Sequence, residues 1–154
     1  MKKHRWILPL LLLAAACGPT LVSQSEFIMA FVASNPSEYE RLRFADDASD
    51  DYNLASAEVA GDSLFLNVSY GGGCSEVTFT LWLNEIILSD TSSLPTLASV
   101  LVLEDPDTCE AEVDNTVAYP LNELPPGPYT LFVHNGAVPG QVVAVDVPAS
   151  NQGN

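Results

Sequence analysis

The sequence predicts an all-β fold, an antiparallel immunoglobulin-like β-sandwich of seven or eight strands. From Tyr52 onward, short runs rich in β-branched and aromatic residues show the alternation of apolar and polar positions that is typical of strands. Clusters of Gly, Pro and Asp separate these runs, and no stretch has the periodicity of a long helix. The 154 residues are enough for one domain around a single core.

The first two runs of this series predict a β-hairpin. Asn53 to Ala60 and Ser63 to Tyr70 flank the dipeptide Gly61-Asp62, which is typical of a two-residue turn. In the second run Leu64, Leu66 and Val68 lie on one side of the strand, so this side is expected to be buried.

The later runs predict the remaining strands. Val77 to Leu83 alternates strictly between apolar and other residues, which predicts a half-buried strand. Leu97 to Leu103 is apolar except for Ser99, which predicts a strand buried on both sides. Three more strands are expected at Val113 to Leu121, Tyr129 to His134 and Gln141 to Val147.

The amino-terminal segment, residues 1–16, has the organisation of a secretory signal peptide. Its first five residues carry three of the five basic charges, and Trp6 to Ala16 is mostly apolar and ends in small residues. An eleven-residue helix would be about 16 Å long, against a hydrocarbon core of about 30 Å. The segment is therefore too short for a permanent transmembrane anchor.

The residues that end this segment, Ala14-Ala15-Ala16-Cys17-Gly18, resemble the lipobox of bacterial lipoproteins, although the family usually has Leu at the position of Ala14. The resemblance implies that Cys17 is lipidated and becomes the mature amino terminus, and that the protein is exported to the cell envelope. Gly18 is not the Asp that resembles an inner-membrane retention signal, so the resemblance implies the outer membrane, facing the periplasm or the surface. The alternative is a plain signal peptide with Cys17 lost or left as a free thiol.

The chain after the signal divides into three parts. Residues 17–43 are predicted as the lipidated cysteine and a tether, in which 27–33 is a candidate first strand and Ser37 to Phe44 a candidate helical turn capped by Ser37. Residues 44–149 are predicted as the sandwich domain, and residues 150–154 as a disordered polar tail.

Charge excludes some classes of partner. The chain has a formal charge of −15, and removal of residues 1–16 takes away three basic residues and no acidic one, which leaves −18. The mature chain has no Lys and only two Arg, Arg41 and Arg43. Such a surface neither neutralises the phosphates of nucleic acid nor adheres to anionic lipid, so the acyl anchor is expected to hold the protein to the membrane.

Cysteine usage predicts one structural disulfide. With Cys17 lipidated, Cys74 and Cys109 remain, 35 residues apart in an exported chain. This spacing does not suit a redox Cys-x-x-Cys motif. Zinc would need two more ligands, and the mature chain has only His134 as a further nitrogen or sulfur donor.

A family resemblance covers roughly residues 50–135. The segment Gly61 to Cys74, which ends in Ser-Tyr-Gly-Gly-Gly-Cys, resembles a group of uncharacterised bacterial lipoproteins, some described as NigD-like. Their second cysteine lies in an acidic loop after a strand, as Cys109 does here. They commonly have His where this chain has Val77. The resemblance implies a β-sandwich and no known activity. Because a strand follows Gly71 to Gly73 and Lys is absent, these glycines predict a tight bend beside the disulfide and not a phosphate loop.

Two acidic segments are candidates for calcium binding. Counted from Asp47, oxygen-bearing residues fall at positions one, three, five, seven and twelve, the last being Glu58, as in an EF-hand loop. Tyr52 replaces the usual Gly, and no helix follows, so a looser site using Asp46, Asp47, Asp50 or Asp51, or a solvated acidic loop, is the alternative. A second acidic cluster, expected beside the Gly-rich bend, comprises Glu104, Asp105, Asp107, Glu110 and Glu112.

No catalytic constellation is evident in the sequence, and no cofactor other than this candidate calcium is expected. His134 precedes Asn135-Gly136 at a strand end, and no Gly-x-Ser-x-Gly motif accompanies it. Trp82 and Tyr129 are expected in the core or on a sheet surface. The leading hypothesis is a non-enzymatic, lipid-anchored sandwich with a binding or structural role and an envelope or extracellular protein partner. The alternatives are a calcium-dependent module and a protease-inhibitor-like module, the latter from the motif Pro126 to Phe132.

Overall fold

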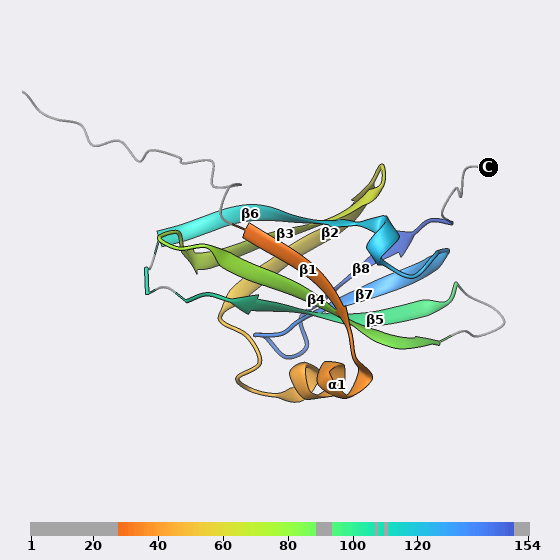
Figure 1. Cartoon of the computed structure of the whole chain (residues 1–154), viewed down its shortest axis with the longest axis horizontal. Helices are drawn as coiled ribbons and strands as arrows, with labels where there is room; N and C mark the ends of the chain where they lie inside the picture. Colours follow the sequence, from red (N-terminus) through yellow and green to blue (C-terminus); the bar gives the residue numbers. More distant parts are fainter. Residues whose placement is uncertain (1–27, 89–93, 107, 110, 150–154) are drawn as a thin grey trace, which may run out of the picture.

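The structure is a computed structural model, and it describes residues 28–88, 94–106, 108–109 and 111–149. The expected sandwich is confirmed, with eight strands in two stacked sheets (Figure 1). The elements in chain order are β1 Ile28–Ser34, α1 Pro36–Phe44, β2 Tyr52–Ala60, β3 Ser63–Gly72, β4 Val77–Leu88, β5 Thr96–Glu104, β6 Ala111–Pro120, the 3-10 turn η1 Leu121–Glu123, β7 Tyr129–Asn135 and β8 Val142–Val147.

The larger sheet has the strand order β1-β4-β5-β7-β8, and the smaller one has the order β2-β3-β6. The expected antiparallel arrangement holds for four strand pairs, but β1 pairs with β4, and β5 with β7, in parallel. Both parallel pairs join strands whose connection passes through the other sheet, an arrangement that single-strand periodicity does not reveal.

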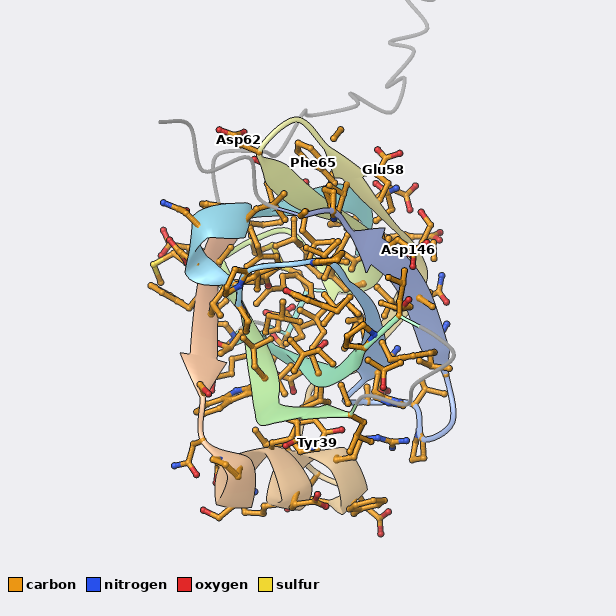
Figure 2. All side chains as sticks on the ribbon, turned by 90° about the vertical axis from the view of Figure 1, so that its right-hand side faces the viewer. Tyr39, Glu58, Asp62, Phe65 and Asp146 are labelled. Atoms are coloured by element: carbon orange, nitrogen blue, oxygen red, sulfur yellow. A yellow bond between two sulfur atoms is a disulfide. The ribbon has the colours of Figure 1, made fainter. Side chains whose placement is uncertain are left out.

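The predicted hairpin is confirmed in β2 and β3. Ala60 pairs with Ser63, and Gly61 has a φ of 62°, a left-handed conformation that the turn requires and glycine adopts without steric cost. In β3 the predicted side is buried, with Leu64 and Leu66 both fully inaccessible. Phe79 and Leu81 of β4, in the other sheet, are equally inaccessible and belong to the same cluster, so the core lies between the two sheets. Figure 2 shows side chains filling this space.

The candidate first strand at 27–33 is present as β1, and because β1 belongs to the larger sheet, the sandwich begins at Ile28 and not at residue 44. β1 is a strand of the larger sheet, and α1 covers the outer face of the same sheet, with Tyr39 directed at it (Figures 1 and 2). The helix starts at Pro36 with Asn35 as its cap, whose side chain accepts a hydrogen bond of 3.2 Å from the Glu38 amide. Ser37, the predicted cap, lies inside the helix.

α1 explains why β5 is buried on both sides, as its apolar sequence predicts. Tyr39 and Leu42 of the helix pack on Val100 and Val102, which point away from the main core. Leu101 and Leu103, on the opposite side of the strand, belong to the main core. A strand at the centre of the sheet therefore needs apolar residues at successive positions.

Candidate binding surface

β1 is an edge strand of the larger sheet, bonded on one side to β4. Its residues alternate: Ile28, Ala30 and Val32 pack on the core, while Met29 and Phe31 point outward and are 42% and 50% exposed. The strand sits at the rim of the sandwich with one side of its backbone facing away from β4 (Figure 1). Two large apolar side chains thus lie on the strand that ends the described sheet.

β1 differs from the other three edge strands of the described sheets in its residues and its register, although β6 of the smaller sheet lies close to part of it. Natural edges are protected by charges, prolines or bulges. β2 has an irregular register between Leu54 and Ser56 and carries Glu58, and β8 carries Asp146. β6 carries Glu112, Asp114 and Pro120. β1 has none of these, and its register with β4 is continuous from Ile28 to Ser34.

An acidic groove of about 380 Å³ begins at Met29. It crosses three neighbouring strands, because Met29 pairs with Thr78 of β4, and Thr78 pairs with Glu104 of β5. Four further residues line the groove, three with carboxylates and one proline: Asp50, Glu76, Asp105 and Pro106. The lining contains no basic residue. The groove therefore combines an apolar wall from β1 with four carboxylate groups.

The acidic loop before β2 is held in place by backbone pairing with β5. The pairing of β7 with β5 ends at Leu101, and Ser49 and Asp50 continue along the same edge. The Ser49 hydroxyl accepts from the Leu103 amide at 2.9 Å, and the Asp50 amide donates to the Leu103 carbonyl at 3.0 Å. The Asp50 carboxylate accepts from the Asp105 amide at 2.6 Å. Asp50 therefore has a structural role that its sequence context did not indicate.

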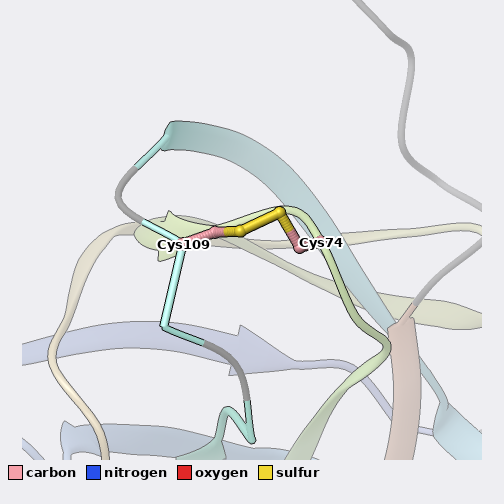
Figure 3. The surroundings of a disulfide bond; sticks show 2 residues. All are labelled: Cys74 and Cys109. Atoms are coloured by element: carbon pink, nitrogen blue, oxygen red, sulfur yellow. A yellow bond between two sulfur atoms is a disulfide. The ribbon is translucent and has the colours of Figure 1, made fainter.

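The predicted disulfide is present and closes the end of the sandwich beside the groove. Cys74 and Cys109 lie 6.1 Å apart at their Cα atoms and join the β3–β4 and β5–β6 connections (Figure 3). A Cβ on Gly72 would stand 2.7 Å from Asp105 Oδ2, so the second acidic cluster lies against the Gly-rich bend, as the sequence predicts. Of that cluster, Asp107 and Glu110 fall outside the described residues, as does Cys17.

The calcium candidates Asp47, Asp51 and Glu58 are not brought together. β2 is extended where an EF-hand would begin its second helix, and Glu58 lies seven positions after Asp51 along this extended chain, a distance of about 23 Å. Glu58 lies at the far end of the smaller sheet (Figure 2). Within the described part of the chain, no three His, Cys, Asp or Glu side chains converge in a way that could hold a metal ion. The EF-hand hypothesis was therefore wrong, because the residues counted as a loop form a strand.

His134 lies on the outer face of the larger sheet, next to Val100 of β5 and Val142 of β8 in the register. Its Nδ1 atom is buried and has no hydrogen-bond partner among the described residues. Burial, and to a smaller extent the positive charge of Arg43, lower the pKa of His134 below its usual value. This environment favours the neutral imidazole.

Trp82 and Tyr129 are confirmed as structural residues. Trp82 packs beside the cluster under α1, and Tyr129 is almost fully buried in the main core. Burial raises the pKa of Tyr129 to about 12. Neither ring stands free as a platform for a ligand.

The Pro-rich segment that suggested a protease inhibitor lies at the opposite end of the sandwich. Its residues enter β7 and line a hollow of about 420 Å³ together with the β2–β3 turn and the end of β8. Gly127 packs against the backbone of Val147 and Pro148. This is an arrangement that closes the sandwich, and the inhibitor hypothesis stays a prediction.

Two solved structures are similar to this chain. A protein of unknown function, DUF1344, from Bacteroides vulgatus superposes with a TM-score of 0.50 at 11% identity, over 81% of this chain and 59% of its own. A protein from Bacteroides fragilis described as a "Putative lipoprotein" superposes with a TM-score of 0.50 at 13% identity, over 79% of this chain and 72% of its own. The similarity is one of fold. The chain spans about three fifths of the first structure.

Neither the protein-family models nor the curated proteins compared with this sequence contain a match. Among the residues that the structure describes, no helix has the length and apolar character needed to cross a membrane.

Proposed function

We propose that this protein is a lipid-anchored binding module of the bacterial cell envelope that has no catalytic role. The observation that carries the proposal is the lipobox-like segment Ala14 to Gly18, placed ten residues before a sandwich that starts at Ile28. Ten residues reach at most about 35 Å. An acylated Cys17 would therefore hold the domain within that distance of the membrane surface.

The charge of the chain supports a covalent anchor. A mature chain of formal charge −18, without Lys, is repelled by anionic lipid. Several acyl chains on one cysteine provide stable attachment where a single chain binds marginally. The fold is also similar to that of the solved protein described as a "Putative lipoprotein", which is consistent with a location in the cell envelope.

The surface around β1 supports a binding role. Met29 and Phe31 are exposed on the edge strand of the larger sheet, and the acidic groove adjoins Met29. Exposed apolar side chains next to a charged rim are typical of surfaces that contact other proteins.

The anchor is tested by expressing the full-length chain in bacteria fed an azide-bearing palmitate. We expect label on the wild-type protein in the membrane fraction and none on Cys17→Ser. The double variant Cys74→Ser/Cys109→Ser, which keeps Cys17, is the matched control and should remain labelled. An unlabelled wild type, or label that persists in Cys17→Ser, would contradict the proposal.

A further inference from the structure

We propose that β1 binds an extended, basic segment of a partner protein, which adds as a strand to the free edge of the five-stranded sheet. This inference deepens the binding role proposed above and rests on it. It names the surface, the mode of recognition and the chemistry of the partner.

The backbone of β1 provides the first part of the argument. The strand is seven residues long, and its bonds to β4 use one of its two sides. The amide and carbonyl groups on the other side belong to residues that are neither charged nor proline. Strand addition uses such groups for affinity and uses neighbouring side-chain contacts for specificity. Of the four described edges, this is the one whose strand carries no charge, no proline and no irregularity of register.

The side chains next to that edge provide the apolar part of the contact. Phe31 pairs with Thr80 of β4, and Met29 pairs with Thr78, so the two apolar side chains stand on the outer face above a row of threonines. A strand added beside β1 would place every second side chain on this face, against Phe31 and Met29. Burial of two half-exposed side chains would favour the complex.

The negative charge of the groove and of the whole chain favours a basic binding partner. At its Met29 end β1 adjoins a groove lined by Asp50, Glu76 and Glu104, with no basic residue in its wall. A second copy of this chain would also carry a charge of −18 in its mature form and contains no Lys. An anionic membrane surface would be repelled in the same way. A Lys- or Arg-bearing segment complements both the groove and the whole molecule.

The two described Arg side chains do not fill this role from within the chain. Arg41 makes an ion pair of 2.6 Å with Glu38 on α1. Arg43 lies 5.3 Å from the ring of Phe44, at the end of the same helix. Neither lines the groove.

The experiment measures binding of a fluorescein-labelled peptide of four Lys-Val repeats to the full chain, purified from membranes in a non-ionic detergent. Two matched peptides test the two halves of the argument. Four Glu-Val repeats have the opposite charge, and Lys-Val repeats with every amide N-methylated lack the main-chain donors. We expect binding of the first peptide alone, and at least tenfold weaker binding when salt is raised from 50 to 500 mM.

Two protein variants locate the site. Phe31→Lys places a cation on the outer face of β1 and should raise the Kd at least tenfold. Val142→Lys introduces the same charge on the same face of the same sheet, on the opposite edge strand, at a residue that is similarly exposed at 43%. It should change the Kd less than twofold. Because both positions are exposed, both variants should keep the wild-type melting temperature within a few degrees.

Four outcomes would overturn the inference. They are no binding of the Lys-Val peptide at 1 mM, equal loss in both variants, equal binding of the N-methylated peptide, and a wild-type dimer in sedimentation that Phe31→Lys dissociates. The last would assign the edge to a second copy. Palmitate labelling of Cys17 does not depend on any of the four, so failure here leaves the anchor standing. If the chain carries no label, the same peptides are tested on the full chain purified from whichever fraction contains it.

Discussion

The hydroxyl group of Tyr52, on the smaller sheet, donates a hydrogen bond of 2.6 Å to the backbone carbonyl of Leu101 on the larger sheet. The Gly136 amide donates to the same hydroxyl at 3.2 Å and to the same carbonyl at 2.9 Å. The side chain of Asn135 donates to the Tyr52 carbonyl at 3.0 Å. The Tyr52 side chain thus links β2 to β5 and to the β7–β8 connection, and the Asn135 side chain links β7 to β2. Asp51, the last residue of the loop between α1 and β2, leads directly into this junction.

Removal of this hydroxyl should destabilise the fold. Tyr52→Phe leaves the buried ring in place and removes two buried hydrogen bonds, so we expect a loss of about 1–2 kcal/mol in the free energy of unfolding. Denaturant unfolding of the full chain measures it. Tyr129→Phe is the matched control, since the Tyr129 hydroxyl is buried without a hydrogen-bond partner among the described residues. Its removal should be neutral or stabilising, and a larger loss for Tyr129→Phe than for Tyr52→Phe would contradict this account.

Gly136 should tolerate no side chain. A Cβ at this position would stand 2.7 Å from the Leu101 carbonyl oxygen, a backbone atom that cannot move aside without disturbing β5. We expect Gly136→Ala to cost about 1–3 kcal/mol, as overpacking does in other cores. Gly71→Ala, at a position with open space around the added carbon, should cost less than half as much in the same thermal melt. Similar costs for the two variants would refute the steric explanation.

The disulfide should contribute strongly to stability. It closes a loop between residues 35 apart in the sequence, for which the chain-entropy model gives about 3–4 kcal/mol. The double variant Cys74→Ser/Cys109→Ser should therefore unfold at clearly lower denaturant concentration than the wild type. Reducing agent should lower the wild-type midpoint and leave that of the double variant unchanged. A midpoint that is the same in wild type and variant would show that the loop needs no cross-link.

His134 should make stability depend on pH in a defined direction. Its pKa in the folded state is lowered, first by burial and then by Arg43, whereas the unfolded chain titrates near the usual value of about 6.5. Its contribution is therefore fully present above that value and is lost as the pH falls through the folded-state pKa, because the unfolded state takes up the proton first.

The measurement compares the wild type with His134→Gln between pH 8 and pH 5. The stability of the wild type relative to the variant should fall as the pH decreases, which separates this effect from the titration of the many carboxylates common to both. An NMR titration of the imidazole should also show a higher pKa in Arg43→Gln than in the wild type. An unchanged imidazole pKa in Arg43→Gln would exclude a role for Arg43.

Alternation along single strands allowed much of the sandwich to be predicted. The pattern that starts at Leu64 and the one from Val77 to Leu83 appear in the structure as the two facing walls of the core. The Gly61-Asp62 turn and the Cys74–Cys109 disulfide could also be predicted from the sequence. The turn depends on the chemistry of two adjacent residues, and the disulfide follows from the number of cysteines. What these features have in common is that the residue type itself sets the structure.

The candidate surface was less predictable. The apolar stretch 27–33 is typical of a strand, but the parallel pairing of β1 with β4 joins residues about fifty positions apart, which no local pattern predicts. Asp50 was counted as a possible calcium ligand, and its actual partner, the Asp105 amide, lies 55 residues away. Ile28 to Ser34 contains no charged residue and no proline. This absence indicates a binding edge only once the strand is known to lie at the edge of a sheet.

By itself, the sequence determined an acidic all-β sandwich with one cross-link, because alternation, turn residues and charge act locally or in sum. Only the tertiary structure decided that Ile28–Ser34 is an edge strand, that α1 covers Val100 and Val102, and that the groove at Met29 is acidic. These features arise from contacts between residues far apart in the chain. The physical reason is that an edge, a covered face and a groove are relations between elements, and a residue's own chemistry does not specify its neighbours.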